Sequence, residues 1–124
     1  MNTFSFSGSP RILLGSDNQH LISALTNALL KAGFHVETAD DYQHLETLWQ
    51  QLRHDIVLLE VSHADSVEPA TESALRIKRQ HAQQFIAYLA DANLRMSGLT
   101  GDAILSRDTA RLPQALREAL EERP

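Results

Sequence analysis

The alternation of apolar and polar residues is most distinctive in the middle of the chain. Residues 56–59 read Ile-Val-Leu-Leu between the carboxylates Asp55 and Glu60, and Val61 continues the run. A run this short and this apolar predicts a strand at residues 55–60 that is buried on both faces, as in a parallel sheet covered by helices. Glu60 would then lie at the carboxyl end of a central strand, where open α/β sheets bind their ligands.

Short apolar runs elsewhere predict further strands. They lie at residues 11–15, 34–38, 85–90 and 103–105. Gly15 closes the first run, and in the second run Phe34 and Val36 face away from His35, as alternate residues of a strand do.

The segments between these runs carry apolar residues at the spacing of an amphipathic helix. Asp17 or Asn18 is suited to cap the first helix, and Asp40 or Asp41 the second. Gly33 is typical of the residue that ends a helix. The apolar positions are Leu21, Ile22, Leu25, Ala28 and Leu29 in the first helix, Leu45, Leu48, Trp49 and Leu52 in the second, Ala74, Leu75 and Ile77 in the third, and Leu112, Leu116 and Leu120 in the last.

Two of the connecting segments are less regular. Residues 62–69 predict a loop before the third helix, and residues 92–101 have space for about two turns of helix at most. Pro113 is tolerated in the last helix because it falls in the first turn. Strands that alternate with helices predict a parallel sheet wound on both sides, since right-handed crossovers leave few other topologies.

The composition sets the class of protein. A chain of 124 residues that is 43% hydrophobic and 22% charged is one globular domain, assigned to residues 11–122 after a flexible lead-in at residues 1–10. Without cysteine, and without an apolar run of ~18 residues, it is expected to be a soluble cytoplasmic protein that does not span a membrane. The net charge of −5 argues against nucleic acid as a partner, because phosphate binding needs a basic face.

Three segments resemble the receiver domain of bacterial response regulators. They read Arg-Ile-Leu-Leu-Gly-Ser-Asp-Asn at residues 11–18, Lys-Ala-Gly-Phe-His-Val at residues 31–36 and Asp-Ile-Val-Leu-Leu-Glu-Val at residues 55–61. The resemblance spans nearly the whole chain. It implies a flavodoxin-like, doubly wound sheet with the strand order 2-1-3-4-5, and a shortened fourth helix because the segment 89–106 is shorter than in a typical receiver.

The resemblance also identifies the positions that handle phosphate in a receiver. The two acidic residues that hold magnesium fall on Ser16 and Asp17, so one carboxylate is missing. The phosphoryl-accepting aspartate falls on Glu60, the hydroxyl of the fourth strand on Leu89, and the lysine after the fifth strand on Ser106. These departures predict a pseudo-receiver that has no catalytic residue, no bound metal and no cofactor.

The chemistry of phosphoryl transfer supports that interpretation. Transfer to a carboxylate depends on positioning and on neutralisation of charge by a metal and a cation. Glutamate places its oxygens about one methylene further out, and a misplacement of ~1 Å costs on the order of 100-fold in rate. Arg107, which follows Ser106, brings a positive charge, but a planar guanidinium does not replace an ammonium.

Glu60 has two interpretations at this stage. It is either a built-in mimic of the phosphorylated state or the carboxylate of a disused site, satisfied by water, by Asn18 and by loop amides. The second is favoured, because Leu89 has no hydroxyl for an added charge to attract.

Two other groups of polar residues carry weaker signals. His63, Asp65 and Glu68 lie in the predicted loop after Glu60 and match no strong metal motif. Their side chains are therefore expected to be exposed to solvent. The basic residues of the third helix predict a solvated face, and they are Arg76, Lys78, Arg79 and His81.

Together these features predict a non-phosphorylatable signalling module at the N-terminal end of a larger signal-transduction or transcription regulator. Its partner would be another protein, an attached output or sensor domain, or a second copy of the chain. One alternative is a working receiver that accepts a phosphoryl group on Glu60 or Asp17 with Mg²⁺. A third is a small-ligand sensor that uses the same cleft.

The last helix offers a candidate interface. Its apolar seam, with the basic residues beside it, consists of Leu112, Leu116, Leu120, Arg111 and Arg117. The competing interpretation, that the three leucines simply cover the sheet, is favoured for most of the seam.

Overall fold

The computed structural model describes residues 10–16, 18–91 and 102–121, in which strands and helices alternate. No helix of these residues is long and apolar enough to cross a membrane. The elements are β1 (Arg11–Gly15), α1 (Gln19–Lys31), β2 (His35–Ala39), α2 (Tyr42–Leu52), β3 (Ile56–Val61), the 3-10 turn η1 (Ala64–Ser66), α3 (Val67–Gln80), β4 (Phe85–Ala90), β5 (Ala103–Leu105) and α4 (Leu112–Glu121).

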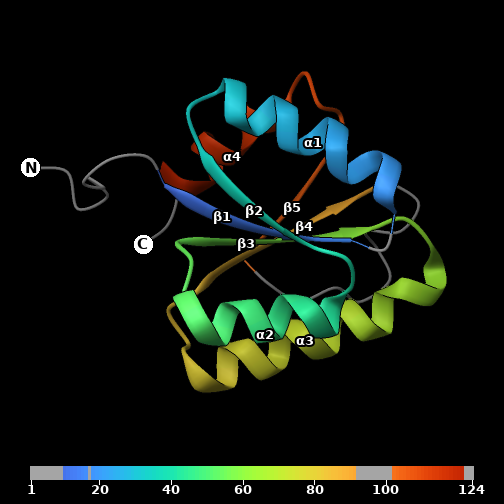
Figure 1. The fold of residues 1–124 in the computed structure, drawn as a ribbon, viewed down its shortest axis with the longest axis vertical. Helices are drawn as coiled ribbons and strands as arrows, with labels where there is room; N and C mark the ends of the chain where they lie inside the picture. Colours follow the sequence, from blue (N-terminus) through green and yellow to red (C-terminus); the bar gives the residue numbers. More distant parts are fainter. Residues whose placement is uncertain (1–9, 17, 92–101, 122–124) are drawn as a thin grey trace, which may run out of the picture.

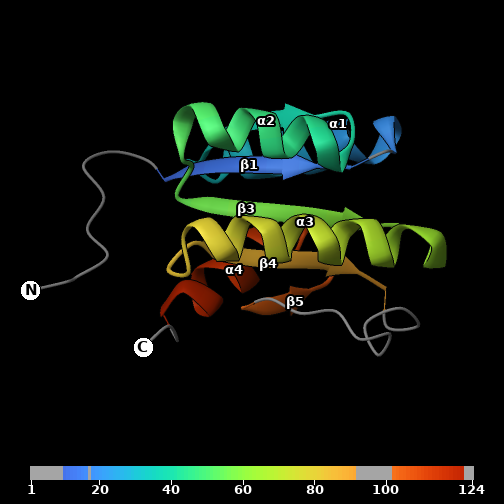
Figure 2. The ribbon, with the colours of Figure 1, turned by 90° about the horizontal axis from the view of Figure 1, so that it is seen from below.

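The described strands form one parallel sheet in the order β2-β1-β3-β4-β5. Ile12 of β1 pairs with Ile56 of β3, and Glu60 of β3 pairs with Leu89 of β4. Helices α1 and α4 cover one face of the sheet and α2 and α3 cover the other (Figures 1 and 2). This is a flavodoxin-like fold in a single domain, so the predicted fold class and strand order are confirmed.

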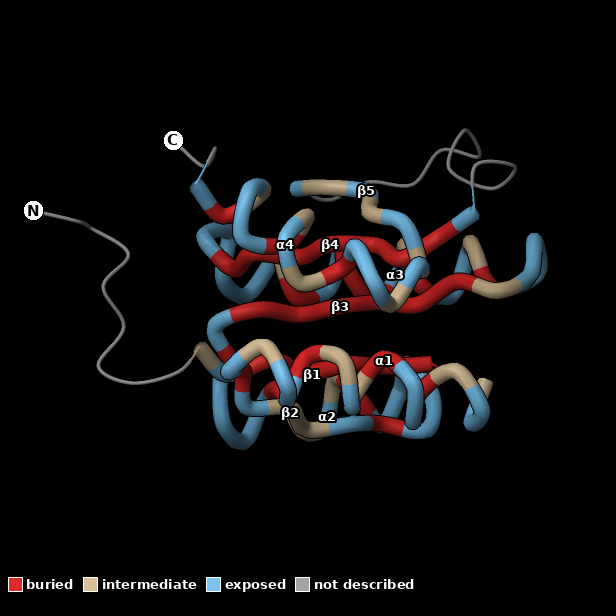
Figure 3. Tube along the Cα trace, turned by 90° about the horizontal axis from the view of Figure 1, so that it is seen from above, coloured by how far each residue is buried: buried red, intermediate tan, exposed pale blue. Residues whose placement is uncertain are grey.

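The central strand β3 is buried along its whole length, as Figure 3 shows. Its residues alternate between two cores, because successive side chains of a strand point to opposite faces. Val57 and Leu59 pack with Trp49 of α2 on one face, whereas Leu58 packs in the core beneath α1 and α4. The same alternation places Glu60 on the face covered by α1 and α4.

The other element boundaries follow the sequence closely. Strands β1, β4 and β5 have the predicted bounds, and β2 and β3 are shifted by one residue. Of the alternative caps, the Asn18 side chain accepts a hydrogen bond from Leu21 N at the start of α1, and Asp41 accepts one from His44 N at the start of α2. Gly33 follows α1 with φ +97°, a conformation that favours glycine.

The third helix begins earlier than the sequence indicates. The prediction of a loop at residues 62–69 is wrong, because η1 and the first turn of α3 occupy most of it. Pro69 falls in that first turn, where a missing backbone N–H breaks no intrahelical hydrogen bond. Leu75 is 42% exposed, since the buried face of α3 is formed by smaller residues around it, namely Ala70, Ser73, Ala74 and Ile77.

Helix α4 turns its leucines toward the sheet. Leu112, Leu116 and Leu120 are buried in the same core as the inner face of α1. They therefore cover the sheet, which is the interpretation that the sequence favours for most of the seam. Arg111 and Arg117 are exposed, and their part in an interface stays a prediction.

Two predictions fall outside the described residues. The shortened fourth helix concerns residues 92–101, and the lead-in at residues 1–10 is described only at Pro10.

Replacing Leu116 by alanine should lower the free energy of unfolding by about 2–5 kcal/mol, because its side chain is fully buried and its removal leaves a cavity. Leu30→Ala is the matched control, since Leu30 is 51% exposed and its truncation should cost less than ~0.5 kcal/mol. Urea denaturation followed by the fluorescence of Trp49 measures both. Equal effects of the two substitutions would contradict the assignment of α4 to the core.

Candidate functional site

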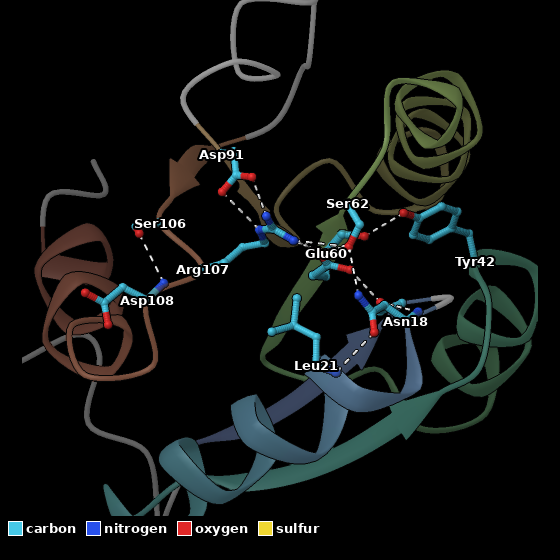
Figure 4. A network of polar contacts seen from close by, with 10 residues as sticks. Asn18, Leu21, Tyr42, Glu60, Ser62, Asp91, Ser106, Arg107 and Asp108 are labelled. Atoms are coloured by element: carbon cyan, nitrogen blue, oxygen red, sulfur yellow. Dashed lines mark hydrogen bonds and ion pairs between the residues drawn. The ribbon is translucent and has the colours of Figure 1, made fainter.

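Polar side chains from several strands meet at the carboxyl edge of the sheet. Ser16 follows β1, Glu60 lies near the end of β3, Asp91 follows β4, and Arg107 lies shortly beyond β5. Figure 4 shows Arg107 turned toward Glu60 and Asp91 turned toward Arg107, with Ser62 from the segment after β3 beside Glu60. Because parallel strands all end at one edge, the topology assembles these residues from distant parts of the chain.

The carboxylate of Glu60 is fully buried and is held by hydrogen-bond donors of the chain itself. Ser16 Oγ donates to Glu60 Oε1 at 2.5 Å, and Ser62 Oγ donates to Oε2 at 2.6 Å. Arg107 Nη1 donates to Oε2 at 3.0 Å and brings a positive charge to the buried negative one. Both oxygens are therefore occupied, which a buried carboxylate requires.

Arg107 connects the ends of three strands. Besides Glu60, its guanidinium contacts both carboxylate oxygens of Asp91, and Nη1 also donates to Ser62 Oγ at 3.2 Å. Partial burial acts to lower the pKa of Arg107, but its hydrogen bonds to Asp91 and Glu60 outweigh burial and raise that pKa above its ordinary value. The guanidinium is a permanent positive charge in this site.

Neighbouring residues orient the two serine hydroxyls. The backbone N–H of Asn18 donates to Ser16 Oγ at 2.9 Å, so the hydroxyl accepts one hydrogen bond and gives its own proton to Glu60. The side-chain amide of Asn18 donates to Ser62 Oγ at 3.4 Å. Tyr42, the first residue of α2, donates from its hydroxyl to the backbone oxygen of Glu60 at 2.6 Å. The strand end is thus fixed through both its backbone and its side chain.

The position of Ser16 depends on the glycine before it. A Cβ at Gly15 would lie 2.5 Å from Leu45 Cδ1 of α2. Glycine therefore permits α2 to pack against the end of β1, directly before the site.

The structure brings together some of the positions identified from the sequence. Ser16 and Glu60 are in direct contact. Leu89 pairs with Glu60 in the sheet, but its side chain is buried in the core beneath α1 and α4. Asp17 lies outside the described residues.

The cation comes from the neighbour of the predicted position. Ser106 is exposed, and its Oγ accepts a hydrogen bond from Asp108 N at 3.1 Å, whereas Arg107 reaches the buried carboxylate. Sequence reasoning also misses Ser62 and Asp91. Each directly follows a strand of the parallel sheet, and that placement is the signal that marks them.

The partners expected for Glu60 are corrected by this geometry. In place of Asn18 and loop amides, two serine hydroxyls and a guanidinium hold the carboxylate. Asn18 affects Glu60 only indirectly, because it donates hydrogen bonds to Ser16 and Ser62, which contact the carboxylate. These partners are possible because the glutamate side chain is long enough to extend from β3 to a side chain of the segment beyond β5.

A magnesium ion, which the receiver resemblance implies, does not fit the described residues beside Glu60. The guanidinium of Arg107 lies 3.0 Å from the Glu60 oxygen that would bind the ion, and a second cation there would be repelled. Within the described ranges, no group of three or more histidine, aspartate and glutamate side chains is placed to hold a metal. His63, Asp65 and Glu68 are exposed.

Solved structures similar to this chain include response regulators and receiver domains. One response regulator from Thermotoga maritima is 18% identical over 92% of this chain and 99% of its own, with a TM-score of 0.75. The T. maritima response regulator TrrA, solved in complex with Mg²⁺-BeF, is 18% identical over 89% of this chain and 98% of its own, with a TM-score of 0.76. An orphan response regulator of H. pylori is 20% identical over 91% and 98%, with a TM-score of 0.70.

These similarities establish that the chain has the receiver fold. No family model and no curated protein matches the sequence. The function therefore has to be argued from the site itself.

Replacing Ser16 by alanine should lower the free energy of unfolding by about 1.5–3 kcal/mol, because a hydrogen bond to a buried charge is lost. Ser23→Ala is the matched control on the exposed face of α1, where the change should stay within ~0.5 kcal/mol. Urea denaturation measures both. A Ser16 variant as stable as the Ser23 variant would show that Glu60 does not depend on this hydroxyl.

Proposed function

We propose that the chain is a receiver-like signalling module of the cytoplasm that acts through protein contacts and does not accept a phosphoryl group on Glu60. The observation that carries the proposal is the commitment of both Glu60 oxygens to Ser16, Ser62 and Arg107 in a fully buried position. A carboxylate held in this way supports the sheet edge and is shielded from a phosphoryl donor.

The charges around Glu60 support the same proposal. Phosphoryl transfer needs cations that neutralise the negative charge on the equatorial oxygens of the transferring phosphoryl group. Arg107 is already paired with Glu60 and Asp91, so its charge is neutralised before any donor arrives. The planar guanidinium of Arg107 also matches the geometry of carboxylates, which favours a stable ion pair.

The proposed partners are another protein, an attached output or sensor domain of a larger regulator, or a second copy of the chain. The receiver fold supports this proposal by analogy, because the similar solved structures include response regulators. Arg111 is a candidate contact, since its side chain is 83% exposed and lies at the start of α4. Arg117 is instead stacked over Phe34.

Incubation with acetyl phosphate and Mg²⁺, or with beryllofluoride and Mg²⁺, should leave the chain unmodified. We expect no phosphoryl adduct in the intact mass and no Mg²⁺-dependent change in the fluorescence of Trp49. T. maritima TrrA, solved with Mg²⁺-BeF, is the positive control for the reagents.

A phosphoryl adduct would instead favour the alternative of a working receiver. Two variants would then locate it, because Glu60→Gln removes one candidate acceptor and Asp17→Asn removes the other. Loss of the adduct in Glu60→Gln would identify Glu60 as the acceptor and overturn the proposal. Loss of the adduct in Asp17→Asn would identify Asp17 as the acceptor and make the chain a working receiver through that residue.

A further inference from the structure

The edge strand β5 has little support of its own. It comprises residues 103–105, pairs only with β4 among the described strands, and is half-exposed, with Ile104 39% exposed. Ala103 and Leu105 pack only partly against the core beneath α1 and α4. A strand this short at the edge of a sheet gains little from backbone pairing, so other contacts must fix its position.

Charged contacts hold both ends of β5. Before it, Asp102 accepts hydrogen bonds from Ile86 N at 2.7 Å and from Lys78 Nζ at 2.8 Å. Beyond it, Arg107 reaches across β4 to Glu60 and Asp91. Asp102 is anchored to the backbone of β4, whereas Arg107 is anchored to the buried carboxylate of the central strand.

Apart from the Arg107 contacts, the loop between β5 and α4 forms few hydrogen bonds with the rest of the described structure. Its other described hydrogen bonds stay within the loop or reach the start of α4, as in Asp108 N to Ser106 Oγ and Leu112 N to Asp108 O. α4 itself is held separately by its buried leucines. Without the Arg107 contacts, β5 would keep only the Asp102 anchor and its short pairing with β4, so residues 103–110 would open more readily while α4 stays in place.

We infer that Arg107 is a latch that holds the β5 edge of the sheet closed against Glu60, and that its release frees residues 103–110 without unfolding the rest of the domain. Arg107 is a positioning residue in this device. Local opening of a weakly packed segment costs less than global unfolding, so such a segment is able to respond to a partner by itself. A partner that competes for Arg107 would thereby open the edge of β4.

The latch is tested by hydrogen exchange of peptides from the full chain, without phosphodonor or magnesium. The main variant carries Arg107→Gln and Glu60→Gln together, because removing both charges leaves no uncompensated charge in the core. We expect exchange in residues 103–110 to rise about tenfold or more, and exchange in β1 and β3 to stay within about threefold of the parent chain. Because no phosphodonor is present, the outcome is independent of the proposed function.

The matched control removes a second arginine–glutamate pair, which lies between two helices among the described residues. Arg76→Gln with Glu46→Gln breaks a two-point contact between α3 and α2 and should leave exchange in residues 103–110 unchanged. Arg107→Lys keeps the positive charge and should release these residues less than the main variant does. Unchanged exchange in 103–110, equal acceleration in all strands, or failure of the main variant to fold would each overturn the latch.

Discussion

The buried ion pair between Glu60 and Arg107 is the interaction on which the carboxyl edge of the sheet depends. Removing one partner of a buried pair typically destabilises a protein by about 3–5 kcal/mol, because the other charge is left without compensation. The two residues are 47 positions apart in the chain, on the central strand and beyond the edge strand. The pair therefore fixes the centre of the sheet relative to its edge, and the hydroxyls of Ser16 and Ser62 complete the shell around the carboxylate.

The residues of this edge form a mutually consistent set. An acidic residue in place of Ser16 would put a second negative charge against Glu60, whereas the hydroxyl donates a hydrogen bond to it. Asp91 binds the remaining donors of Arg107, so the guanidinium has partners on two strands. The described side chains around Glu60 are thus matched to one another in charge and in hydrogen bonding, and such agreement between local choices is typical of a well-folded protein.

The strands and helices were predictable because they depend on short-range patterns, whereas the strand order was implied by the resemblance to receiver domains. The apolar run before Glu60 and the glycine at position 15 identify buried strands and their ends without knowledge of any distant contact. The site depends on which side chain crosses from one strand end to the next. Arg107 and Ser106 are adjacent, and only the three-dimensional course beyond β5 turns one toward Glu60 and leaves the other exposed.

The length of the glutamate side chain explains how the same fold can hold a carboxylate at this strand end without using it for phosphoryl transfer. A carboxylate at this edge is reactive when its oxygens face solvent, a metal and a phosphoryl donor. In this chain the longer side chain carries the oxygens to donors on the segment beyond β5, and burial then makes those donors indispensable. The same strand end thus serves as a structural joint between β3 and β5.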